Sequence, residues 1–125
     1  MGHEADATFE PSPSSVARAR SFVRTTLSGW GIGQLSDATT LLVSELATNA
    51  VVHARTAFRL HVEFDDPRLT VEVHDGSIVL PRRDDAGPDD ARGRGLRIVD
   101  GLAATWGHRR DDDGKTVWFT LDCTT

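Results

Sequence analysis

The sequence has only one cysteine and no long apolar run, and these two features exclude an internal disulfide and a membrane-spanning helix. Cys123 has no second cysteine with which to form an internal disulfide. No apolar stretch reaches the roughly 20 residues that a membrane-spanning helix needs. The N-terminal segment lacks the basic and apolar regions of a secretory signal. We therefore expect a single cytoplasmic domain over residues 1–125, with no membrane partner.

Basic charge is also scarce. The chain has 125 residues and a formal net charge of −5. A general nucleic-acid binder needs a basic face to neutralise phosphates, so we expect no direct nucleic-acid partner. Lys115 is the only lysine among 14 lysines and arginines. We attribute this bias to a GC-rich coding sequence and expect no mechanistic role from it.

Several common catalytic and metal-binding motifs are missing. No GK[ST] tripeptide follows Gly93-Arg94-Gly95, so this segment is not a Walker A loop, and no GxSxG pentapeptide forms a nucleophile elbow. No group of histidines and cysteines has zinc-ligand spacing. Covalent catalysis by this chain is therefore not expected.

The hydrophobic pattern predicts an alternation of helices and strands. The first 14 residues are expected to be flexible or to hold a short strand at Ala7–Glu10, and residues 76–92 have the composition of a loop. The first expected helix is capped by Ser14 or Ser15 and is ended by Gly29 and Gly31. The second begins near Ser36 or Asp37 and ends at about His53, and the third extends from about Arg94 to Leu102. The other expected strands are Ala57–Phe64, 69–75, Thr105–Arg110 and Lys115–Asp122. This order predicts a two-layer α/β sandwich, with helices on one face of a mixed, mostly antiparallel sheet.

The first polar constellation is the pair Glu45 and Asn49 in the second predicted helix. Their i, i+4 spacing places both side chains on one helix face. Spacing alone favours a solvated face. However, Glu45 has no basic residue at i±3 or i±4, and the surrounding sequence LLVSELATNAVV is strongly apolar. A carboxylate and an amide held together can orient a nucleophile and ligate a hard cation through oxygen.

The second constellation is Asp75-Gly76 at the end of a predicted strand. Asp75 continues the alternation of Leu69, Val71 and Val73, so its carboxylate is predicted to point toward the core and to need a donor. That donor is either a backbone N–H in the following turn or an exocyclic amine of a ligand such as adenine. Gly76 would let a ligand approach the backbone closely.

The third constellation is Gly93-Arg94-Gly95-Leu96, which precedes a predicted helix. Backbone N–H groups at a helix N-terminus favour phosphate oxygens. Arg94 could also reach a phosphate. An ordinary pair of loop glycines explains the pattern equally well.

The order of these motifs resembles the GHKL, or histidine kinase-like, ATPase family. The matching segments are ELATNAVVHA, VHDGS, GRGL and GKTVW, within a resemblance that extends from about Ser15 to Leu121. Within that family the sequence is most similar to the small anti-sigma-factor serine/threonine kinases. The Glu-x-x-x-Asn segment is the most specific part of the resemblance.

The resemblance implies a role for each constellation. Asn49 would ligate Mg²⁺ on bound ATP, and Glu45 would be the general base. Asp75, beside Gly76, would recognise the adenine amino group, and Thr116 would join a water network near Asp75. The phosphates would be held by Gly93, Arg94, Gly95 and Leu96, and residues 76–92 would be the ATP lid.

The sequence departs from the family pattern in one glycine motif and in length. The usual D-x-G-x-G motif reads DGSIV at residues 75–79. The chain has no room for a dimerisation helix pair with a phospho-acceptor histidine, so we do not expect a complete sensor histidine kinase. We likewise do not expect the further domains that the larger ATPases of the family carry.

We therefore expect an anti-sigma-type serine/threonine kinase that phosphorylates a small anti-anti-sigma partner with Mg-ATP. A sigma factor is a further expected partner, and the family implies a homodimer. The alternative is a non-catalytic nucleotide-binding regulator that sequesters a protein partner. A plain interaction module without a nucleotide is a third, weaker reading.

Overall fold

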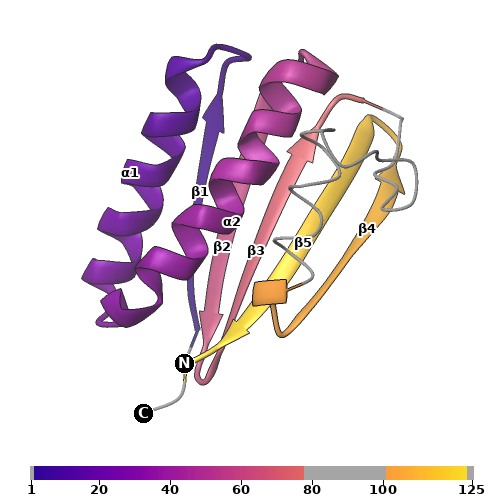
Figure 1. Cartoon of the computed structure of the whole chain (residues 1–125). Coiled ribbons are helices and arrows are strands. Elements are labelled where there is room, and N and C mark those ends of the chain that lie inside the picture. Colours follow the sequence, from indigo (N-terminus) through magenta and orange to yellow (C-terminus); the bar gives the residue numbers. More distant parts are fainter. Residues whose placement is uncertain (1, 78–100, 124–125) are drawn as a thin grey trace.

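The computed structural model describes residues 2–77 and 101–123, which form a helical layer packed on a sheet (Figure 1). The helical elements are α1 (Ser14–Gly29), η1 (Gly33–Leu35), α2 (Ser36–Thr48) and η2 (Asn49–Ala54). The strands are β1 (His3–Phe9), β2 (Phe58–Asp65), β3 (Arg68–Asp75), β4 (Thr105–Asp111) and β5 (Gly114–Asp122).

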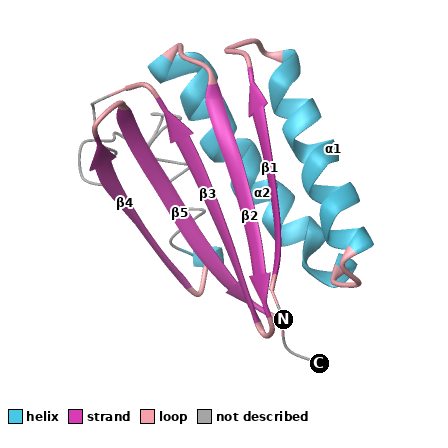
Figure 2. Ribbon diagram, turned by 180° about the vertical axis from the view of Figure 1, so that it is seen from behind, coloured by secondary structure: helices cyan, strands magenta, loops and turns pink. Residues whose placement is uncertain are grey.

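The five strands form one sheet in the order β1-β2-β3-β5-β4. Every pairing among these strands is antiparallel, where a mixed sheet was expected. Figure 2 shows the sheet from behind, with α1 and α2 on its far side. The predicted two-layer α/β sandwich with helices on one face is thus confirmed.

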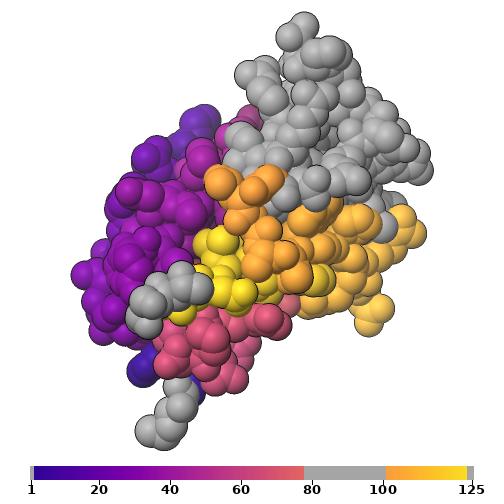
Figure 3. Space-filling model, turned by 60° about the horizontal axis from the view of Figure 1, so that its bottom comes forward, coloured from indigo at the N-terminus to yellow at the C-terminus, as the bar shows by residue number. Residues whose placement is uncertain are grey.

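The core lies between the two layers because each layer has one apolar face. The helices contribute Ala19, Val23, Leu27, Leu42, Val43, Leu46 and Ala47, and β2 contributes Phe58, Leu60, Val62 and Phe64, all buried. Alternate residues of β3 and β5 complete this face of the sheet, as in the register Leu60–Val73–Val117. Burial of each large apolar side chain contributes about 1.5–3 kcal/mol. From below, the helical layer (indigo to magenta) lies to one side of the strands (Figure 3).

Two element boundaries differ from the predictions. β1 begins at His3 rather than Ala7, because pairing along the whole of β2 supplies partners for its backbone groups. The second helix does not remain α-helical to His53. It changes at Asn49 into a π-helical turn, in which the Arg55 N–H donates to the Ala50 carbonyl at 2.8 Å. Arg55 then ends the turn in the left-handed conformation, with φ of 58°.

Most of the segment between β3 and β4 lies outside the described residues. The predicted loop is described only at Gly76 and Ser77, and the predicted third helix only at Gly101 and Leu102, which are helical. Among the described helices, none combines the length and the apolar character needed to cross a membrane.

Candidate functional site

Segments far apart in the sequence meet at one end of the sheet. β3 ends where β5 begins, and the C-terminal end of α2 lies at the same end, uppermost in Figure 1. The link from η2 to β2 is joined to this end by a hydrogen bond, in which the Gly76 N–H donates to Thr56 Oγ1 at 2.9 Å. The antiparallel order therefore gathers Asn49, Asp75 and the start of β5 on the same end of the domain.

The central feature of this end is a buried ion pair between Asp75 and Lys115. Lys115 Nζ lies 3.2 Å from Asp75 Oδ1 and 3.1 Å from Oδ2, and the two side chains are only 11% and 5% exposed. Asp75 Oδ1 also accepts the Ser77 N–H at 2.9 Å. The prediction that Asp75 points inward is confirmed, and a backbone N–H of the following turn is one of its donors.

Lys115 is the residue that the sequence reasoning missed. Its rarity was attributed to coding composition, yet the only lysine of the chain neutralises the carboxylate at this end. The alternation of β5 could have predicted that Lys115 points inward, because Lys115 belongs to the same series as the buried residues Val117, Phe119 and Leu121. A buried ammonium requires a carboxylate partner.

Two glycines let the strand ends approach each other closely. Gly114 has φ of 151°, and a Cβ placed there would lie 1.9 Å from the Asp75 carbonyl oxygen. A Cβ at Gly76 would lie 3.2 Å from Thr56 Cγ2. Gly114 therefore allows β5 to start directly against Asp75, which brings Lys115 within reach of the carboxylate.

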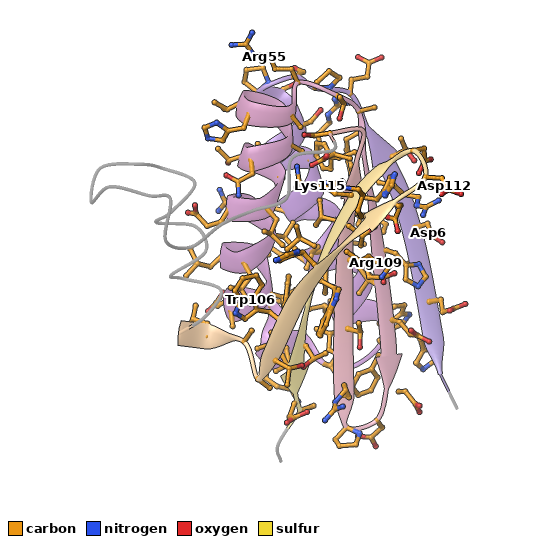
Figure 4. The ribbon with its side chains drawn as sticks, turned by 90° about the vertical axis from the view of Figure 1, so that its right-hand side faces the viewer. Asp6, Arg55, Trp106, Arg109, Asp112 and Lys115 are labelled. Carbon is orange, nitrogen blue, oxygen red and sulfur yellow. The ribbon has the colours of Figure 1, made fainter. Side chains whose placement is uncertain are left out.

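Thr116 lies on the other face of β5 and is not brought to Asp75. Its hydroxyl donates to Asp111 Oδ2 and lies 3.0 Å from His74 Nδ1. Figure 4 shows the two faces, with Lys115 on the side of α2 and Arg109 on the opposite side. The expected water network of Thr116 near Asp75 is therefore not supported by this placement, because successive residues of a strand point to opposite faces.

The outer face around Thr116 carries a charged network that perturbs two groups. The hydrogen bond from Thr116, followed by that from Arg109, lowers the pKa of Asp111 below its ordinary value. The hydrogen bond to Glu72, at 3.1 Å, raises the pKa of Arg109 further above its usual range. Both shifts favour the charged forms that pair on this face.

Glu45 and Asn49 flank the point where α2 changes into the π-helical turn. Both side chains are partly exposed, and neither has a hydrogen-bond partner within the described residues. A π-turn inserts an extra residue in a helix, and such turns are frequent at functional sites. As far as the described residues are concerned, the polar atoms of this pair are therefore available to a ligand.

The described donors and acceptors fit a magnesium nucleotide. The amide oxygen of Asn49 and the carboxylate of Glu45 are the oxygen ligands that hard cations prefer. Among the described residues, Asp75 Oδ2 forms the ion pair with Lys115 Nζ at 3.1 Å, so a lone pair remains for an exocyclic amine. The expected phosphate-binding residues Gly93, Arg94, Gly95 and Leu96, and most of the expected lid, lie outside the described residues.

Comparison with protein families identifies the class to which this fold and this site belong. The model of the histidine kinase-like ATPase domain matches residues 9–121. The chain belongs to the histidine kinase-like ATPase family, as the order of its motifs indicated. A comparison with curated proteins found no match.

A solved structure with a similar fold is that of the RsbU and RsbW domains of Rv1364c from Mycobacterium tuberculosis. The two chains are 16% identical and superpose with a TM-score of 0.71. The match covers 94% of this chain and 32% of that chain, so this chain spans about a third of the longer protein. At this identity the similarity shows a shared fold.

Proposed function

We propose that the chain binds Mg-ATP at the Asp75 end of the sheet and acts as an anti-sigma-type serine/threonine kinase on a small anti-anti-sigma partner. The observation that carries the proposal is the buried Asp75 carboxylate. It is fixed by Lys115 and Ser77 and keeps an acceptor site on Oδ2, at the end of the sheet that Asn49 shares. Family membership and the RsbW domain in the similar structure support the same reading.

Each residue then has a defined task. Asp75 Oδ2 accepts a hydrogen bond from the exocyclic amine of adenine, while Lys115 holds the carboxylate in position. Asn49 ligates the magnesium ion through its amide oxygen. ATP supplies the phosphoryl group, and Glu45 removes the proton from the attacking serine hydroxyl of the partner.

Nucleotide binding is tested by calorimetry with Mg-ATP on wild type, Asn49→Ala and Asp75→Asn. For Asp75→Asn, loss of a hydrogen bond to a charged group costs about 1.5–3 kcal/mol, which corresponds to an affinity loss of roughly 10- to 150-fold. Asn49→Ala should weaken binding because it removes a magnesium ligand. Asp113→Asn is the matched control for Asp75, because the Asp113 side chain is 83% exposed on the hairpin turn. Absence of heat and of thermal stabilisation in the wild type would refute the nucleotide proposal.

Catalysis is tested separately, with γ-labelled ATP and an anti-anti-sigma domain encoded beside the gene. Removal of a general base slows transfer about 10²- to 10⁴-fold, so Glu45→Gln should bind ATP normally and transfer label slowly. Glu10→Gln, at an exposed residue just after β1, is the control. If the wild type binds Mg-ATP and the partner but transfers no label, the protein is a non-catalytic regulator that sequesters its partner.

A further inference from the structure

A second polar cluster lies on the face of the sheet away from the helices, at the edge formed by β1. β1 pairs with β2 so that Glu4 lies opposite Glu63 and Asp6 opposite His61. Ligand atoms of Glu4, His61 and Glu63 all lie within 4.8 Å of one another. Figure 4 shows Asp6 on the side of the sheet away from α2. The cluster is therefore separate from the Asp75 end and shares no residue with it.

The carboxylates of this cluster repel one another, which favours the binding of a cation. Two glutamates directly opposite each other on neighbouring strands repel and destabilise the pairing. Glu63 also lines a shallow hollow at the end of the β2–β3 hairpin, where three more carboxylates face one arginine, in the set Asp65, Asp66, Asp122 and Arg68. The local field at Glu63 is therefore negative, and a bound cation would relieve the repulsion.

The imidazole of His61 is oriented as a metal ligand. Its Nδ1 lies 2.7 Å from Asp6 Oδ1, and because a carboxylate only accepts, Nδ1–H is the donor and Nε2 is the ring nitrogen that a metal ion would use. Nε2 lies 3.8 Å from Glu4 Oε1, which is too long for a hydrogen bond. Two ligand bonds of about 2.1 Å reach across about 4.2 Å, so one ion can bridge these atoms.

We propose that Glu4, His61 and Glu63 bind one divalent cation of the zinc type, with Asp6 orienting the imidazole. A nitrogen ligand with two carboxylates suits zinc, cobalt or nickel better than magnesium or calcium, which take oxygen ligands. Such an ion joins the edge strand β1 to β2. Sequence spacing could not reveal the site, because its ligands come from both ends of a long connection and meet only in the sheet register.

The test is a calorimetric titration of the tag-free, chelator-treated full chain with Zn²⁺, without nucleotide. One equivalent should bind, and thermal unfolding should shift to higher temperature with zinc and return with EDTA. Glu4→Gln and His61→Gln remove ligands, and each should lower zinc affinity by at least tenfold. Asp6→Ala removes the orienting carboxylate, which typically costs about 10- to 100-fold.

Two histidine variants are matched controls. His74→Gln removes an imidazole on the same outer face, where both ring nitrogens already lie 3.1 and 3.3 Å from carboxylates. His3→Gln removes the neighbour of Glu4, which stacks on Trp30 with ring centroids 5.4 Å apart. Both should bind zinc as the wild type does.

The outcomes are distinct. The proposal is wrong if the wild type takes up no stoichiometric zinc, or if His61→Gln binds zinc as tightly as the wild type does. Because the Glu4 side chain is 63% exposed, Glu4→Gln tests the site without disturbing the core. In a histidine NMR spectrum, zinc should shift the ring signals of His61 and leave those of His74 in place.

Discussion

The ion pair at the end of β3 makes a quantitative prediction about stability. In Lys115→Met the alkyl stem is kept and the ammonium is lost, so the buried Asp75 carboxylate retains only the Ser77 N–H among its described donors. Removing one member of a buried pair costs about 3–5 kcal/mol. We expect the lower value, about 3 kcal/mol, because the Ser77 hydrogen bond remains. A domain of this size has about 5–15 kcal/mol of stability in total, so the loss is large.

The assay is urea unfolding of the nucleotide-free protein. With a slope of about 2 kcal/mol per molar urea, a loss of 3 kcal/mol lowers the midpoint by about 1.5 M. The surface pair Arg68–Asp122 is the control, because its side chains are 59% and 45% exposed and lie 3.6 Å apart. Arg68→Met should change stability by no more than about 1 kcal/mol.

A double-mutant cycle sharpens the test. Replacing both members, as in Lys115→Met with Asp75→Leu, removes the uncompensated charge, so the double variant should be more stable than Lys115→Met alone. If Lys115→Met costs less than about 1 kcal/mol, or if the two losses simply add, the carboxylate is not held by Lys115 and the account of this site is wrong.

Two further predictions concern the turn at β5 and the outer face. Gly114→Ala should destabilise the fold by more than about 2 kcal/mol in urea unfolding, because its Cβ would overlap the Asp75 carbonyl, whereas Gly33→Ala has open space and should be within about 0.5 kcal/mol of wild type. Because Thr116 lowers the pKa of Asp111, this carboxylate stabilises the fold at neutral pH and loses that contribution as the pH falls below about 4. Thr116→Val should therefore show a smaller loss of stability between pH 5 and pH 3 than wild type, and an unchanged pH profile would contradict the assignment.

The parts of the fold with regular apolar patterns could be predicted from the sequence. β2 and β3 alternate in burial as the sequence alternates in polarity, and the same parity gave the inward direction of Asp75. The hairpin of β4 and β5 followed from Asp112-Asp113-Gly114 between two extended segments. These features depend on local periodicity, which a single sequence carries.

The features that depend on register or backbone geometry could not be predicted. The Asp75–Lys115 pair depends on the β3–β5 register. A shift of one residue in that register would place Thr116 opposite Asp75 in place of Lys115. The π-turn after Thr48 has no sequence signal of its own, because NAVVHA continues the apolar helical pattern. The local sequence pattern predicted only a short first strand, and the longer β1 results from its pairing with β2.

The strand order also has a consequence for how the molecule assembles. Two of the four strand pairings are formed by tight hairpins, whereas β1–β2 and β3–β5 join segments that are distant in the chain, as in Asp6–His61 and Asp75–Lys115, 55 and 40 residues apart. Contacts of this range are entropically costly to form, because the intervening chain must be closed into a loop. The proposed zinc site spans one of these pairings and the nucleotide end spans the other. Each ligand would thus stabilise a strand pairing that carries a large loop-closure cost.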